Sequence, residues 1–173
     1  MEYSDFIPLR KFLAINPDFF HSETNLKKFF QNLISVVYYL HKNKIIHRDI
    51  KTTNILISPD GESIKLLDFG VAKKFNEMEF NLSPQGDFKY RAPEIKFEGG
   101  YNENCDIWSC GLVLYSILLE KNITTKKLLE NVDMGEEMKG MSKELNELLK
   151  KMNCICPKNR ISAEEILLNP WLH

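Results

Sequence analysis

The sequence has almost no net charge and no long apolar run, and each absence argues against a class of protein. Its 173 residues carry 23 basic and 24 acidic side chains, without the excess that nucleic-acid or membrane-surface binding requires. The longest nearly apolar run, residues 110–119, is interrupted by Gly111 and Ser116 and is too short to span a bilayer. The N-terminus shows no basic leader followed by an apolar segment. We therefore expect a cytoplasmic or nuclear protein with no nucleic-acid partner and no membrane partner.

Cysteine is also scarce, with four residues at positions that match no common zinc-ligand spacing: Cys105, Cys110, Cys154 and Cys156. All four fall in segments that look helical or buried. We therefore favour free thiols in a reducing compartment over a metal site. A domain of this length can bury roughly 70% of its unfolded surface, so a core can form without disulfides.

Apolar periodicity predicts most of the helices. From Thr24 to Leu40 apolar residues recur at i, i+3 and i+4, with Ser22 or Thr24 available as the N-cap. A buried helix is predicted over 106–120, followed by a polar, lysine-rich stretch over 121–139. Two helices are predicted to close the chain, one over 142–152 and one opening at Ser162 with a capping-box pattern.

Short β-rich pieces lie between the first two of these helices, at 45–46, 55–57 and 64–67. A Ser-Pro-Asp-Gly turn over 58–61 joins the last two. Residues 68–94 show no sustained period and contain two glycines and two prolines, which is typical of a loop. The predicted fold class is mainly α with short β-hairpins.

Two motifs stand at the edges of these strands. The first is His47-Arg48-Asp49-Ile50-Lys51-Thr52-Thr53-Asn54, and the second, which begins fourteen residues after Asn54, is Asp68-Phe69-Gly70. Carboxylates, an amide and a lysine meet the main need of phosphoryl transfer, which is to position groups and neutralise phosphate charge. In order and spacing these motifs resemble the catalytic loop and metal-binding motif of protein kinases.

Later motifs extend the resemblance over essentially the whole chain, 1–173. Ala92-Pro93-Glu94 resembles the end of an activation segment, here 68–94, and 106–111 resembles the buried central helix of the family. Arg160 falls where the family pairs an arginine with that glutamate. The resemblance therefore implies a protein kinase-like C-terminal (large) lobe that lacks the N-terminal β lobe.

The resemblance also implies roles for individual residues. Asp49 would accept or orient the proton of the substrate hydroxyl, and Lys51 would lie beside the transferred phosphate. Asn54 and Asp68 would bind Mg²⁺ and, with it, ATP. A lysine at position 51 also favours serine or threonine over tyrosine as the acceptor.

Other residues are assigned supporting roles by the same resemblance. Leu56 would pack beneath adenine, and Glu2 and Ser4 would lie in the hinge that offers backbone groups to it. The following residues are expected to be structural: His47, Phe69, Gly70, Glu94, Asp106 and Arg160.

A regulatory role is implied for Arg48, Lys73 and Ser83. A phosphate on Ser83 would pair with Arg48 and Lys73 and order the activation segment. Ser83 followed by Pro84 also fits a simple Ser-Pro turn, and Arg48 also fits an ordinary surface ion pair. Both alternatives stay open.

Departures from the family pattern leave two functions open. No Gly-x-Gly-x-x-Gly and no Val-Ala-x-Lys strand precedes His47, so the groups that cover the ATP phosphates are not present. Asp87 stands where a hydroxyl residue is usual, and its carboxylate is expected to compete for Lys51 or to raise a neighbouring pKa. The chain is either an ATP-dependent serine/threonine protein kinase truncated before the hinge, or a catalytically inactive kinase-like module that binds and regulates another kinase.

We expect a protein substrate or another kinase as partner, and a partner that covers the exposed top of the lobe.

Overall fold

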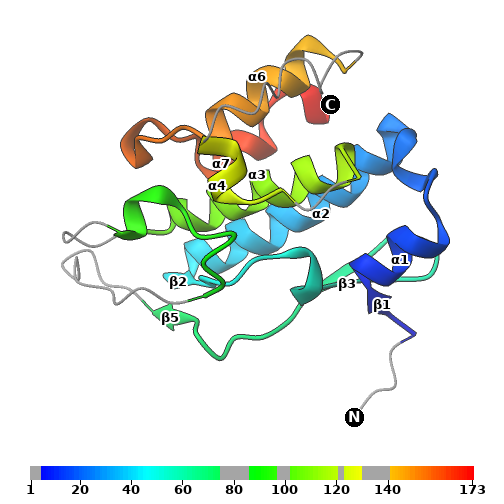
Figure 1. Ribbon diagram of the computed structural model, residues 1–173, viewed down its shortest axis with the longest axis horizontal. Helices are drawn as coiled ribbons and strands as arrows, with labels where there is room; N and C mark the ends of the chain where they lie inside the picture. The colour runs from blue at the N-terminus through cyan, green and yellow to red at the C-terminus, as the bar shows by residue number, and fades with distance from the viewer. Residues whose placement is uncertain (1–4, 75–85, 97–101, 121–122, 130–140) are drawn as a thin grey trace.

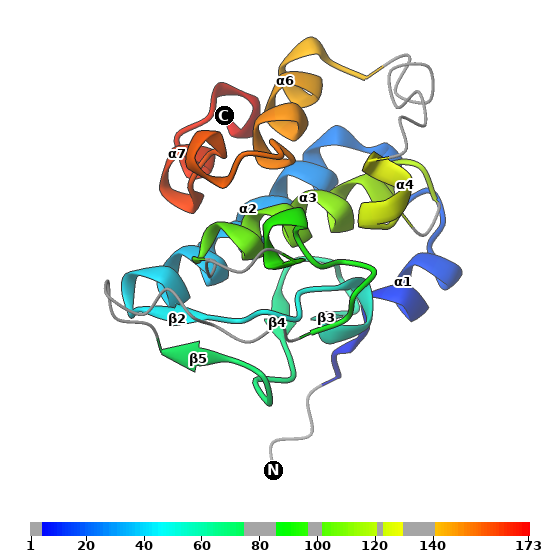
Figure 2. The same ribbon diagram turned by 60° about the vertical axis from the view of Figure 1, so that its left-hand side comes forward.

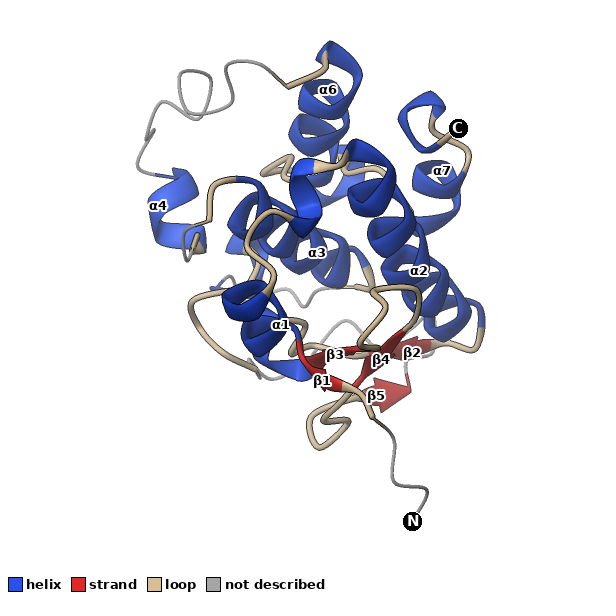
Figure 3. Cartoon of the chain, turned by 90° about the vertical axis from the view of Figure 1, so that its right-hand side faces the viewer, coloured by secondary structure: helices blue, strands red, loops and turns tan. Residues whose placement is uncertain are grey.

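The helices form a single packed body, and the strands lie along one edge of it (Figures 1 and 3). The computed structural model describes residues 5–74, 86–96, 102–120, 123–129 and 141–173. The helices are α1 (Leu9–Ile15), α2 (Glu23–Lys42), α3 (Asn104–Leu118), α4 (Thr125–Leu129), α6 (Lys143–Met152) and α7 (Ala163–Leu167). The strands are β1 (Ile7–Pro8), β2 (Ile45–Ile46), β3 (Ile55–Ile57), β4 (Ile64–Leu66) and β5 (Lys73–Lys74). Five 3₁₀ turns complete the described elements: η1 (Phe19–His21), η2 (Thr52–Asn54), η3 (Pro93–Lys96), η4 (Pro157–Asn159) and η5 (Pro170–Leu172).

The amphipathic helix predicted from Thr24 is α2, and the prediction is confirmed. Ser22 is its N-cap, and the Ser22 hydroxyl accepts a hydrogen bond from the Asn25 N–H. Its buried stripe is the predicted apolar set: Leu26, Phe29, Phe30, Leu33, Ile34, Val37 and Leu40. This stripe is the apolar face that a helix needs in order to pack on a core.

The second predicted helix is α3, which is buried over nearly its whole length. It begins and ends two residues earlier than predicted. The chain leaves the helix at Leu119, and Glu120 then takes a positive φ of 50°, which an α-helix does not allow. Asp106, in the first turn, is fully buried.

The predicted hairpin of β3 and β4 is present, with Ile55 opposite Leu66 and Ile57 opposite Ile64. Its turn needs glycine at position 61, because φ there is +76° and a Cβ would lie 2.1 Å from the Phe19 ring. Strand β1 adds to β3, and β2 pairs with β5. The two-residue strands β1 and β5 were not predicted, because Pro8 and the two lysines of β5 are poor strand formers, unlike the two isoleucines of β2.

Helices α6 and α7 lie on the side of the helical body away from the strands (Figure 2). Ser142 caps α6, and Ser162 and Glu165 form the predicted capping box of α7. The polar stretch after α3 contains the short helix α4, which was not predicted. Within the described ranges, no helix combines the length and apolar character that crossing a membrane requires.

Candidate active site

Asp106 anchors the beginning of the loop that follows β2. Its carboxylate accepts hydrogen bonds from the backbone N–H groups of His47 and Arg48, both at 2.9 Å. The Nε2 atom of His41 lies 3.0 Å from the same carboxylate. Arg48 itself has a φ of +69°, a conformation that costs free energy for any residue with a side chain. The buried carboxylate therefore stabilises a backbone shape that the sequence alone disfavours.

Asp49, Lys51 and Asn54 form one hydrogen-bonded cluster. The Lys51 ammonium lies 2.8 Å from Asp49 Oδ2. The Asn54 amide donates to the same oxygen at 2.8 Å and to the Asp49 carbonyl at 2.9 Å. Asp49 and Asn54 are buried, so the carboxylate is fixed in position by its partners.

The β3–β4 hairpin brings Asp68 to this cluster. Its ladder continues beyond the strands, because the Leu67 N–H donates to the Asn54 carbonyl at 2.8 Å. Asp68, the next residue, has a φ of +63°, and its Oδ1 accepts from the Gly70 N–H at 3.2 Å. The hairpin register thus places the acidic residue of the second motif beside the last residue of the first.

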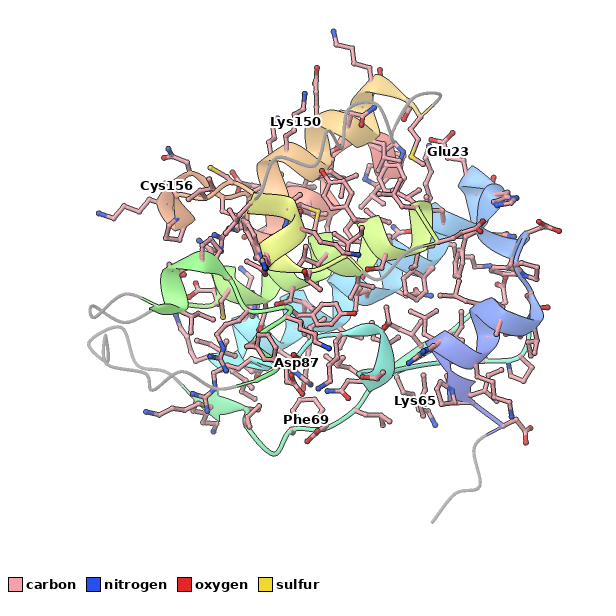
Figure 4. All side chains as sticks on the ribbon, in the orientation of Figure 1. Glu23, Lys65, Phe69, Asp87, Lys150 and Cys156 are labelled. Atoms are coloured by element: carbon pink, nitrogen blue, oxygen red, sulfur yellow. The ribbon has the colours of Figure 1, made fainter. Side chains whose placement is uncertain are left out.

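His47 and Phe69 form the packing contact expected of them. Their rings lie 4.8 Å apart, and His47 Nε2 is 2.9 Å from the Leu67 carbonyl oxygen. Phe69 is nevertheless 48% exposed. Figure 4 shows Phe69 and Asp87 at the strand-bearing edge of the helical body, far from Lys150 on α6.

Asp87 does not compete for Lys51 in the way expected from the sequence. Its carboxylate accepts from the Lys89 N–H at 3.0 Å, whereas Lys51 pairs with Asp49. Its own N–H donates to Asp49 Oδ1 at 2.8 Å. The backbone N–H of residue 87 therefore satisfies the second oxygen of Asp49, which any residue except proline could do.

Glu94 and Arg160 form the expected ion pair. The guanidinium binds both carboxylate oxygens, at 2.6 and 2.9 Å, and both side chains are buried. Arg160 also donates to the Cys154 carbonyl and lies over the Trp108 ring. This pair ties η3 to the segment that precedes α7.

The other expected site residues that the structure describes do not belong to the cluster around Asp49. Leu56 is half-buried in β3. Arg48 donates to the Val71 carbonyl, and Lys73 lies opposite Ile46 in the β2–β5 pair, so both basic residues flank the same stretch of loop. Glu2, Ser4 and Ser83 lie outside the described residues.

Thr125 and His41 contribute contacts that sequence analysis missed. The Thr125 hydroxyl accepts from the Trp108 indole N–H at 2.9 Å and donates to the Arg91 carbonyl at 2.7 Å. These bonds fix the segment that follows Asp87. No local signal marks either residue, because their partners are 17 to 65 positions away.

The cysteines differ in burial. Burial raises the pKa of the Cys105 and Cys110 thiols well above the ordinary value. Cys154 is half-buried and Cys156 is exposed. The expectation that all four lie in helical or buried segments was therefore wrong for Cys156, because a proline and a 3₁₀ turn follow it.

The loop after β2 and the β3–β4 hairpin bring the residues of the two motifs together around Asp49. The sequence matches the family model of the protein kinase domain over residues 1–172. The chain therefore belongs to the protein kinase family.

Curated relatives are themselves protein kinases. The chain is 34% identical over 159 residues to a carbon catabolite-derepressing protein kinase of Candida glabrata, which covers 87% of this chain and 26% of that protein. It is 31% identical over 163 residues to calcium-dependent protein kinase 4 of Plasmodium berghei, covering 87% and 31%. It is 31% identical over 161 residues to a probable myosin light chain kinase of Dictyostelium discoideum, covering 88% and 52%. The chain thus spans about a quarter to a half of the length of these relatives.

Proposed function

We propose that residues 1–173 are the large C-terminal lobe of an ATP-dependent serine/threonine protein kinase, with 68–94 as its activation segment. The observation that carries the proposal is the cluster in which Lys51 and Asn54 both bind Asp49 while the hairpin ladder delivers Asp68 beside them. A purely structural loop does not require two carboxylates, an amide and a lysine at one end of a hairpin.

In this proposal Asp49 accepts or orients the proton of the substrate hydroxyl. Its carboxylate is already fixed by three donors, from Lys51, Asn54 and the backbone of Asp87. The ammonium of Lys51, which lies 2.8 Å from Asp49, would neutralise charge on the transferred phosphoryl group. Serine or threonine is the proposed acceptor because of this lysine.

The donor atoms present fit Mg²⁺. Mg²⁺ prefers oxygen ligands, and Asn54 uses its amide nitrogen for Asp49, which leaves its amide oxygen for a cation. Asp68 uses one carboxylate oxygen for the Gly70 N–H, which leaves the other. Bound Mg²⁺ would neutralise charge on the ATP phosphates. Adenine would lie over Leu56, next to Glu2 and Ser4.

Cover for the ATP phosphates has to come from outside these 173 residues, because the sequence contains no glycine-rich loop and no matching lysine. Removing one preorganised donor typically costs about 3–4 kcal/mol of transition-state stabilisation, or roughly 100- to 1000-fold in rate. The chain by itself is therefore expected to transfer phosphate slowly.

Control of activity is proposed to involve Ser83. A phosphate there would be held by Arg48, which follows β2 closely, and by Lys73 in β5. An alternative is that Ser83 only opens a Ser-Pro turn. Hydrogen exchange over residues 68–94 would separate the two, because only the first predicts slower exchange in a Ser83→Asp variant.

A second candidate function is a non-catalytic module that binds and regulates another kinase. It is favoured by the carboxylate of Asp87 near Asp49 and by the exposure of Leu67 and Phe69, at 40% and 48%. Apolar side chains exposed beside one another often mark a partner surface.

The test is phosphate transfer from labelled ATP and Mg²⁺ to a protein substrate, compared between the chain and its Asp49→Asn and Asp68→Asn variants. Transfer that falls at least about 100-fold in both variants supports the kinase. Mn²⁺ affinity, measured in parallel, should fall in Asp68→Asn but not in Asp49→Asn. A chain that transfers no phosphate and binds Mn²⁺ equally with or without Asp68 would overturn the proposal and favour the regulatory module.

A further inference from the structure

A groove of about 890 Å³ opens beside the candidate active site. The lining residues come from α1, η1 and the beginning of α2, from 51–53, the 87–90 segment and the end of α3, and from the beginning of α6. Lys51 and Asp87 both line it and both bind Asp49, so a chain lying in the groove would lie next to the residues that hold that carboxylate. The groove is thus placed to hold the residues that flank an acceptor hydroxyl.

The acidic side chains of the groove are already engaged within the protein. Glu23 accepts from the Trp171 indole N–H at 2.9 Å, and Glu120 lies 2.9 Å from His21 Nε2. Asp87 accepts from the Lys89 backbone. Each carboxylate has therefore already satisfied part of its hydrogen-bonding capacity, and each offers less to an incoming cation than a free carboxylate would.

Lys51 and His21 are likewise paired, with Asp49 and Glu120, but two other basic side chains of the groove are not paired with any described residue. Arg10 on α1 and Lys89 both line the groove and are exposed. Within the part of the chain that the structure describes, neither side chain forms an ion pair. These two charges are therefore available to a ligand, one from α1 and one from the 87–90 segment.

The neighbouring groove surface is apolar, with Leu13, Phe20 and Leu118 among the lining residues. Apolar walls exclude water and strengthen an ion pair formed against them. Neutral hydroxyls of Thr53 and Ser116 complete the lining near the catalytic loop. The charge that the groove can offer to a ligand is thus positive and comes from Arg10 and Lys89.

We propose that this groove selects protein segments in which acidic residues, aspartate or glutamate, flank the acceptor serine or threonine. Arg10 and Lys89 are the residues that determine this preference. The inference rests on the proposed kinase function for the identity of the acceptor, but the binding preference can be measured without any phosphate transfer.

The test uses three fluorescently labelled peptides with one central serine and three flanking glutamates, glutamines or lysines. Fluorescence anisotropy should give the tightest binding for the glutamate peptide, with an affinity that falls as salt is added. In the Arg10→Glu, Lys89→Glu double variant, the glutamate peptide should bind at least about 10-fold more weakly. The matched control is Lys150→Glu, because Lys150 is exposed on α6 away from the groove (Figure 4).

Several outcomes would overturn the inference. Equal binding of the three peptides, or tighter binding of the lysine peptide, would do so, as would unchanged binding in the double variant. A phosphoserine-flanked peptide that binds when the glutamate peptide does not would show that the groove selects phosphate instead. Arg10→Gln and Lys89→Gln provide the same test if charge reversal prevents folding. The Asp49→Asn variant should keep the peptide preference, so loss of transfer and loss of selection are separable.

Discussion

Asp106 anchors the loop that contains Asp49 through several hydrogen bonds at once. It is fully buried, accepts two backbone hydrogen bonds and lies 3.0 Å from His41. Its interaction with His47 and Arg48 fixes the backbone immediately before Asp49. A change of this carboxylate should therefore affect both folding and the site.

We predict that Asp106→Asn lowers the free energy of unfolding by about 1–3 kcal/mol, because an amide NH₂ would replace one acceptor and leave a buried donor unsatisfied. Urea unfolding measures the change. Glu147→Gln, on the exposed face of α6, is the control and should stay within about 0.5 kcal/mol. An Asp106→Asn protein as stable as the control would contradict the anchoring role.

Thiol labelling offers a second test at the residue scale. Cys156 should react with iodoacetamide in the native protein, whereas Cys105 and Cys110 should react at least about tenfold more slowly, because burial raises their pKa and blocks access. Peptide mass spectrometry identifies the modified sites. All four should react at similar rates in denaturant, and rapid native labelling of Cys110 would show that α3 is not buried as described.

At the scale of elements, strong periodicity predicted structure well and short segments escaped prediction. The seven-residue apolar stripe of α2 indicated which face of the helix is buried, and the capping pattern at Ser162 marked the start of α7. Strands β1 and β5, with two residues each, exist because β3 and β2 pair with them. A tertiary partner is not visible in a local sequence window.

We predict that Ser162→Ala lowers the free energy of unfolding by about 1 kcal/mol, because α7 loses its N-cap. Ser162→Thr keeps the hydroxyl and is the matched control. Thermal unfolding of the three proteins measures the difference. If alanine and threonine have the same effect, the cap contributes nothing.

The capping box also predicts a pH dependence. Hydrogen bonds from the Ser162 backbone N–H and hydroxyl lower the pKa of Glu165 below its ordinary value of 4.5. The stabilisation is therefore complete above pH 4.5 and is lost as pH falls through the lower folded-state pKa. The stability difference between the protein and Glu165→Gln should shrink as pH falls from 6 to 3, measured by urea unfolding. A difference independent of pH would exclude an ionised Glu165 from the cap.

At the scale of the whole molecule, Arg160 and Glu94 connect segments 66 residues apart. We predict that Arg160→Met lowers the free energy of unfolding by about 3–5 kcal/mol, because Glu94 is left as a buried, unpaired charge. Lys158→Met, an exposed neighbour, should change it by less than about 0.5 kcal/mol. Chemical denaturation measures both.

The double variant Arg160→Met, Glu94→Leu tests directly whether the two side chains interact. Removing both charges should cost less than the sum of the two single changes, because neither charge is then left alone. Strict additivity would mean that the two side chains do not interact in solution.

The site was predictable from sequence to the extent that its residues are close in the chain. The catalytic-loop motif placed Asp49, Lys51 and Asn54 within six positions, and the hairpin explains why Asp68 joins them. The contribution of His41 required the fold, since it meets Asp106 across 65 positions. The hydrogen bond from the Asp87 N–H to Asp49 could not be predicted either, because it depends on backbone geometry and not on the Asp87 carboxylate.

Arg48 and Asp68, one from each motif, both have positive φ angles, at a cost of about 1–2 kcal/mol each. Both depend on the surrounding fold to keep these shapes, so loosening of the core should release them first. On slow heating, the geometry of the two motifs should consequently be lost some degrees before the helical signal disappears. The thermal limit of the candidate site would then be set by the backbone at Arg48 and Asp68 and not by the melting temperature of the helices.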